Sequence, residues 1–146
     1  QARDDQAEAH RLFAAAVALF AEIGDQWSLA RAWNLFGRFA LDVGDSILAQ
    51  DSFVQAGRAA LAAQVVPFVL DALTGLATLS LQSGEAEAAA QIVQTVLKHP
   101  AVPHDAQNRA EQLWAELNER GFGDQAEHNP HLYQRLVAQF FSNVSK

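Results

Sequence analysis

The chain of 146 residues contains neither cysteine nor methionine. Without cysteine there is no disulfide framework, no thiolate ligand for zinc and no thiol catalysis. A lack of disulfides is typical of cytoplasmic proteins, and we expect that location. Because even an initiator methionine is missing, we expect the chain to be a piece of a longer protein.

Positive charge is also scarce. Ten Lys and Arg stand against 17 Asp and Glu, which gives a formal net charge of −7. No basic stripe is visible, and contacts with phosphates require clustered Lys and Arg. No apolar run approaches the ~20 residues of a membrane-spanning helix, and no secretory signal begins the sequence. The sequence therefore predicts that this segment contacts neither nucleic acid nor membrane.

Glycine and proline are sparse and stand between stretches rich in alanine, leucine and glutamine. Such stretches favour helix, and the alternating pattern of strands is missing. Gly24, Gly44 and Gly84 are expected to end helices. Asp25 is expected to cap the second helix, and either Asp45 or Ser46 the third. The apolar spacing predicts an all-α protein with helices at about 4–23, 26–43, 47–63, 66–83, 86–98, 105–120 and 130–142.

Two segments resemble each other at a constant offset of 40 residues. The first segment carries, in order, Trp33, Phe36, Gly37, Ala40, Gly44, Ala49, Phe53 and Ala56. The second carries Leu73, Leu76, Ala77, Ser80, Gly84, Ala89, Val93 and Val96. A further step of 40 residues back from Ala49, Phe53 and Ala56 reaches Ala9, Phe13 and Ala16. The chain therefore contains an internal repeat of two helices, with the second half of a third copy at its start.

This pattern resembles the tetratricopeptide repeat, in which a large residue, Leu-Gly, a Tyr and Ala-x3-Phe recur about every 34 residues. The resemblance implies an α-α superhelix of stacked antiparallel helix pairs. Small residues such as Gly37 and Ala49 let the helices of a pair approach closely, and Phe53 fills the gap between adjacent pairs. The sequence departs from the pattern because Ala40 and Ser80 replace the tyrosine and because each repeat is longer.

The longer repeat is similar to that of large bacterial transcription activators of the LuxR type, related to the maltose regulator, and of related signalling ATPases. Ile23-Gly24-Asp25-Gln26-Trp27 looks like their inter-repeat signature, and 99–117 looks like the terminal portion of such an array. The resemblance implies a protein-protein interaction scaffold of a transcription regulator or signalling protein. A domain that senses a small effector is the alternative, and an enzyme with an unfamiliar site is a remote one.

The predicted organisation is a repeat array over 1–125 followed by a capping helix over 126–146. The array divides into a half repeat at 1–24, repeats at 25–64 and 65–104, and a terminal helix at 105–121. The last helix carries a wide apolar stripe formed by Leu132, Tyr133, Leu136, Val137, Phe140, Phe141 and Val144. This stripe predicts a cap folded onto the last pair, and the alternative is self-association or partner docking through 132–144.

The first helix of each pair is expected to line a concave groove for a protein or peptide partner. Arg31, Asn34 and Arg38 share one helix face, and arginine pairs well with carboxylates. The alternative is a solvated face without a ligand. Steps of 40 residues complete the candidate groove with Asp71, Thr74, Thr78, Glu111, Trp114 and Asn118.

Signals for catalysis and for cofactors are weak. The chain contains neither a glycine-rich phosphate loop nor a Gly-x-Ser-x-Gly motif. His128 and His131 have a spacing that suggests metal binding, but Pro130 interrupts the pair, and we interpret them as loop residues. The sequence therefore predicts no enzyme activity, no metal and no cofactor.

Overall fold

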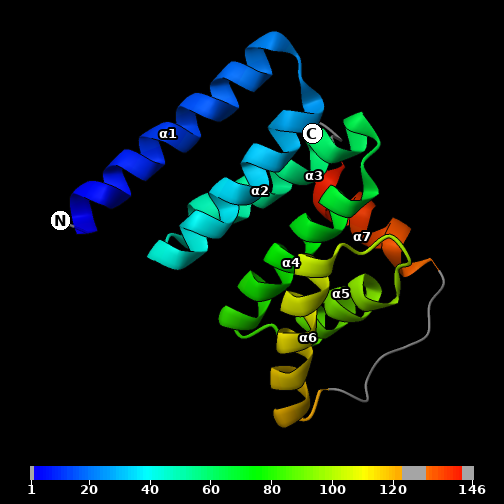
Figure 1. Ribbon diagram of the computed structural model, residues 1–146. Coiled ribbons are helices and arrows are strands. Elements are labelled where there is room, and N and C mark those ends of the chain that lie inside the picture. The colour runs from blue at the N-terminus through cyan, green and yellow to red at the C-terminus, as the bar shows by residue number, and fades with distance from the viewer. Residues whose placement is uncertain (1, 123–130, 143–146) are drawn as a thin grey trace.

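The computed structural model describes residues 2–122 and 131–142, and these are helical without any strand. Seven helices follow one another in this part of the chain (Figure 1). They are α1 (Ala2–Ile23), α2 (Gln26–Val43), α3 (Ser46–Ala63), α4 (Val66–Gln82), α5 (Ala86–Lys98), α6 (His104–Glu119) and α7 (Leu132–Phe141). The predicted all-α class is confirmed, and the predicted helix ends agree to within two residues.

The corners between helices follow from local chemistry. The Asp25 side chain accepts a hydrogen bond from the backbone N–H of Ser28 at 3.0 Å, and Asp45 caps α3 in the same way through Leu48 at 3.1 Å. Gly44 ends α2 in the left-handed conformation at φ +80°, which favours glycine. Gln64 adopts a similar conformation at φ +60° after α3, where the sequence gives no glycine signal.

The helices stack as antiparallel pairs (Figure 1). Helix α3 packs against α2 within one pair and against α4 of the next, and α5 and α6 continue the array. The first helices of successive pairs also meet, because α2 contacts α4 and α4 contacts α6. Among the described residues, however, α3 has no contact with α5, and α1 has none with α3. The array is therefore continuous along α2, α4 and α6 and open between the second helices.

Phe53 occupies the point where three helices meet. A Cβ atom added at Gly37 of α2 would lie 2.7 Å from the Phe53 ring, and one added at Gly75 of α4 would lie 2.4 Å from it. Both distances are far below normal van der Waals contact. The ring is buried at 1% exposure, so the two glycines admit it between α2 and α4. This confirms the roles that the sequence predicts for Gly37 and Phe53.

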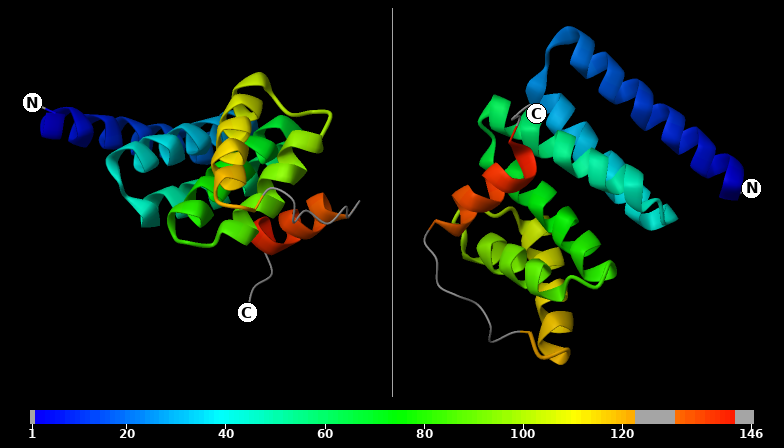
Figure 2. Two further views of the ribbon diagram at one scale, coloured as in Figure 1. Left: turned by 90° about the horizontal axis from the view of Figure 1, so that it is seen from below. Right: turned by 180° about the vertical axis from the view of Figure 1, so that it is seen from behind.

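Helix α7 lies in the opening between α3 and α5 and contacts both (Figure 2). Its stripe is used within the chain, since Leu136 and Phe141 are buried. The Phe141 ring presses on α3 where a Cβ at Gly57 would lie only 2.1 Å from it. The helix therefore bridges α3 and α5, the second helices of two successive pairs, and contacts the last predicted pair through α5. Val144 lies outside the described residues.

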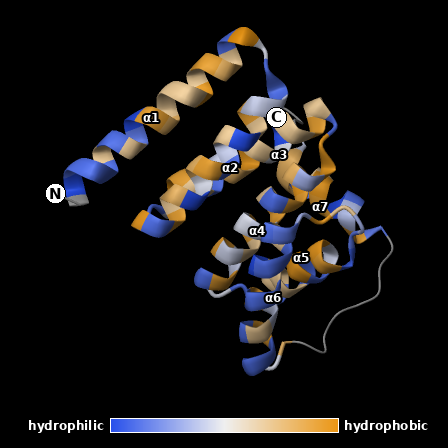
Figure 3. Cartoon of the chain, in the orientation of Figure 1, coloured by the Kyte–Doolittle hydropathy of each residue, from blue (hydrophilic) through white to orange (hydrophobic). Residues whose placement is uncertain are grey.

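Apolar residues occur on every helix (Figure 3). Across residues 2–122 and 131–142 no helix combines the length and apolar character that crossing a membrane requires. One core cluster runs from α2 through α7 and includes Phe53, Leu70, Leu73 and Ile92 at 2% exposure or less. A smaller cluster joins α1 to α2 through Val17 and Phe36.

Replacing Gly57 with alanine should release α7. The new Cβ would overlap the Phe141 ring, so we expect the free energy of unfolding to fall by about 1–3 kcal/mol. Gly-to-Ala changes inside helices ordinarily stabilise by about 0.5–1 kcal/mol, so the sign is diagnostic. Hydrogen exchange should show faster exchange of the α7 amides. Gln50→Ala, at an exposed site on the same helix, serves as the control, and unchanged exchange in α7 would contradict the expectation.

Candidate functional site

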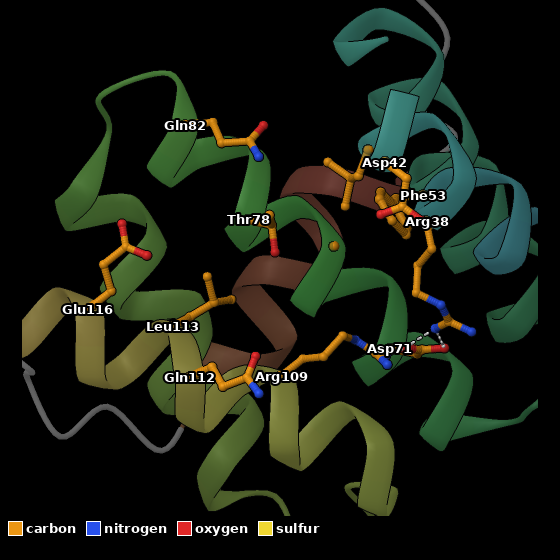
Figure 4. Close-up of a pocket in the computed structure, with 12 residues that line it drawn as sticks. Arg38, Asp42, Phe53, Asp71, Thr78, Gln82, Arg109, Gln112, Leu113 and Glu116 are labelled. Atoms are coloured by element: carbon orange, nitrogen blue, oxygen red, sulfur yellow. Dashed lines mark hydrogen bonds and ion pairs between the residues drawn. The ribbon is translucent and has the colours of Figure 1, made fainter. Parts of the chain in front are cut away.

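A hollow of about 480 Å³ opens between α2, α4 and α6. These are the helices on which the sequence predicts a groove. Its lining combines charged, amide and apolar side chains from the three helices, with Phe53 of α3 among the apolar ones (Figure 4). The lining residues are Arg38, Leu41, Asp42, Phe53, Asp71, Gly75, Thr78, Gln82, Arg109, Gln112, Leu113 and Glu116.

The central feature of the hollow is one carboxylate shared by two arginines. Arg38 Nη1 donates to both carboxylate oxygens of Asp71, at 3.0 and 2.9 Å, and Arg109 Nη2 donates to Asp71 from the opposite side (Figure 4). Asp71 is 15% exposed, and the arginines are about one-third exposed. Two guanidiniums face one carboxylate, so the cluster carries one positive charge in excess and connects α2, α4 and α6.

Burial affects the guanidinium of Arg109. Desolvation lowers the pKa of Arg109 below its ordinary value and Arg38 acts in the same direction, while the charges of Asp71 and Asp105 oppose that change. Arginine remains a cation at any physiological pH. A half-buried cation that is only partly compensated gains from a second anion, because its own desolvation is then better balanced.

A second hollow of about 210 Å³ adjoins the first and shares Arg38 and Asp71 with it. Asn34 lies in its lining, 1% exposed, and its Nδ2 donates to the backbone carbonyl of Phe68 at 3.2 Å. Its Oδ1 is buried and accepts no hydrogen bond from the described residues. A buried acceptor without a donor is costly. Asn34 therefore places one buried, unsatisfied acceptor beside the charged cluster.

The structure brings together five of the nine residues predicted for the groove. Arg31, Asn34, Arg38 and Asp71 line the smaller hollow, and Arg38, Asp71 and Thr78 line the larger one. The other four, Thr74, Glu111, Trp114 and Asn118, are in neither lining.

Each of these four residues has a different environment. Thr74 is buried, and its hydroxyl donates to the carbonyl of Leu70 at 2.8 Å. Trp114 packs against the core, while Glu111 and Asn118 are exposed on α6. The step of 40 residues does not hold for α6, because its lining residues Arg109, Leu113 and Glu116 come 38 residues after Asp71, Gly75 and Thr78 of α4. Two residues turn a helix face by roughly 160°, so Glu111 faces away from the groove.

Arg109 is the functional residue that the repeat pattern misses. A different signal points to it: Asp71 is an acidic residue on an otherwise apolar helix, and such a residue requires a cation from a neighbour. Arg109 is the one arginine in the first half of α6. A search for a cation to pair with Asp71 therefore leads to Arg109, whereas equal steps along the sequence do not.

Of the two histidines considered for metal binding, His128 and His131, His128 lies outside the described residues. Within residues 2–122 and 131–142, no group of three or more His, Asp or Glu is arranged to hold a metal ion. Comparison of the chain with protein-family models, curated proteins and solved structures finds no match. The functional interpretation therefore depends on the geometry of the groove.

That geometry suits binding of an extended polar chain. The shared cluster offers guanidinium donors. The larger hollow also contains two exposed carboxylates, Asp42 and Glu116, and Leu41 supplies apolar surface. Glu116 is paired with Arg120 at 2.7 Å, which leaves Asp42 to favour a cation from a ligand. Arginine pairs bidentately with carboxylates, and exposed carboxylates favour cations. The groove thus favours a ligand anion beside Arg38 and Arg109 and a ligand cation beside Asp42.

Replacing Asp71 with asparagine should destabilise the protein, because two partly buried guanidiniums would lose their carboxylate and repel each other. Allowing for solvent screening, we expect a loss of about 1–2 kcal/mol in urea unfolding. The loss should be larger at low salt, where repulsion is less screened. Asp42→Asn removes a carboxylate from the same hollow and is the matched control. Equal effects of the two substitutions would contradict the assigned role of Asp71.

Proposed function

We propose that this chain is a protein-interaction scaffold that binds an extended segment of a partner protein in the groove of α2, α4 and α6. The observation that carries the proposal is the Arg38–Asp71–Arg109 cluster at the centre of that groove, with its excess positive charge. Asp105 also acts on Arg109, and a ligand carboxylate beside the arginines would balance their charge more fully. The proposal includes no catalytic step and no cofactor.

The shape of the site favours a chain over a compact ligand. Three successive first helices form the groove, and two hollows meet at Arg38 and Asp71. An acidic residue near Arg38 and a basic residue near Asp42 would match the charges that line the larger hollow. This defines the partner segment by its charges.

The proposal extends to the kind of protein that contains the module. The 40-residue period and the Ile23–Trp27 signature support a tetratricopeptide-like array of a bacterial transcription regulator or signalling protein in the cytoplasm. In such a protein the array would bind a partner and transmit that event to an effector domain elsewhere in the chain. The continuous row of first helices α2, α4 and α6, with its two hollows, supports this use.

A second candidate function is the sensing of a small effector. The larger hollow, at about 480 Å³, lies in the range of about 300–1,000 Å³ that is usual for small-ligand sites. A small dicarboxylate would satisfy both arginines. Thermal-shift measurements with dicarboxylic acids separate the candidates, since a ligand that binds only the folded state raises the Tm.

Selection of phage-displayed 12-residue peptides on the full chain tests the main proposal. We expect enriched peptides to contain Asp or Glu, and the double variant Arg38→Ala/Arg109→Ala to bind them at least tenfold more weakly, because two charge-assisted contacts are lost. Arg135→Ala, an exposed arginine on α7, should bind as the unaltered chain does. Selection without acidic enrichment, or binding that survives the double substitution, would contradict the proposal.

A further inference from the structure

Helix α1 presents a row of large apolar side chains to solvent. Leu12, Leu19 and Ile23 are 60%, 54% and 61% exposed. Their spacing of seven and four residues places them on one face of the helix. A neighbouring face of α1 is used within the chain, where Phe13 and Val17 pack against Phe36 of α2. An uncovered row of this kind marks a surface for another protein segment.

The repeat register identifies what covers these positions elsewhere in the array. Forty residues after Leu12 and Leu19 stand Ser52 and Ala59 of α3, and both are buried, at 0% and 5% exposure. Helix α3 makes its most extensive contact with α2, the first helix of its own pair. The equivalent face of α1 has no such partner among the described residues (Figure 1). The open face of α1 therefore corresponds to the face of α3 that α2 covers.

The residues beside the row set the charge of the partner. Glu8 and Glu22 stand within about one helical turn of the row and Asp5 within about two, and all three are exposed. Arg11 is also nearby, but it is paired with Glu8. Net negative charge thus borders the apolar row at both ends. A second copy of α1 would bring acidic residues against acidic residues, and like charges at short distance are unfavourable.

We propose that this face of α1 docks an amphipathic helix of a partner segment, which runs antiparallel to α1 and has basic flanks. The docked helix takes the place that α2 takes on α3 and so adds one more first helix to the row of α2, α4 and α6. The surface is separate from the peptide groove and does not depend on the proposed function. A basic amphipathic helix suits this surface, because its apolar face can be buried against the row and its basic residues can pair with the acidic residues at both ends.

A synthetic peptide tests this assignment directly. The probe carries the α2 sequence, residues 26–43, with two lysines added at each end, and its binding to the full chain is followed by fluorescence anisotropy. We expect saturable binding that weakens at least tenfold in the variant Leu12→Asp/Leu19→Asp, because two buried leucines are lost. Ile47→Asp, at an 86% exposed site on α3, should leave the binding unchanged. Thermal unfolding of each variant verifies that the array remains folded.

Charge provides a second, independent readout. The surface variant Glu8→Lys/Glu22→Lys should bind the lysine-flanked peptide more weakly and a glutamate-flanked version more tightly. Equal binding of both peptides to the unaltered chain would overturn the proposal, as would binding that survives Leu12→Asp/Leu19→Asp. Sedimentation that reveals a dimer dissolved by the same leucine substitutions would also overturn it, because a second copy would then be the occupant.

Discussion

The architecture depends on the position of one aromatic ring between two glycines. Phe53 of α3 reaches across its own pair to Gly37 and into the next pair to Gly75, and a side chain at either glycine would overlap it. Because interiors are close-packed, this contact sets how near α2 and α4 approach each other. Isolated pairs expose too much apolar surface to be stable alone, so the stacking contact at Phe53 is a condition for folding.

The same contact positions the site. Arg38 follows Gly37 directly, and Asp71 lies one helical turn before Gly75, so the approach of the two helices also brings the guanidinium and the carboxylate together. Phe53 itself lines the larger hollow. Stability and binding are thus coupled through one location: the residues that close the core between two pairs also form the floor and the charged centre of the groove.

The sequence predicts more of the fold than of the candidate site. Helix ends follow from Gly44, Asp25 and similar local signals, and the 40-residue repeat predicts the stacking. The repeat fails where geometry is not local: α6 is turned by two residues, so Arg109 and not Glu111 faces Asp71. The position of α7 was likewise beyond the pattern, because a stripe shows that a helix is covered but not by what; Gly57 opposite Phe141 decides that.

The central claim is that Phe53 requires glycine at position 75, and a pair of stability measurements tests it most directly. Gly75→Ala should lower the free energy of unfolding by about 1–3 kcal/mol while Phe53 is present, because the new methyl group overlaps the ring. In a Phe53→Leu background the same change should be neutral or stabilising. If Gly75→Ala instead stabilises the protein with Phe53 in place, as helix propensity alone would do, the account of how the pairs stack is contradicted.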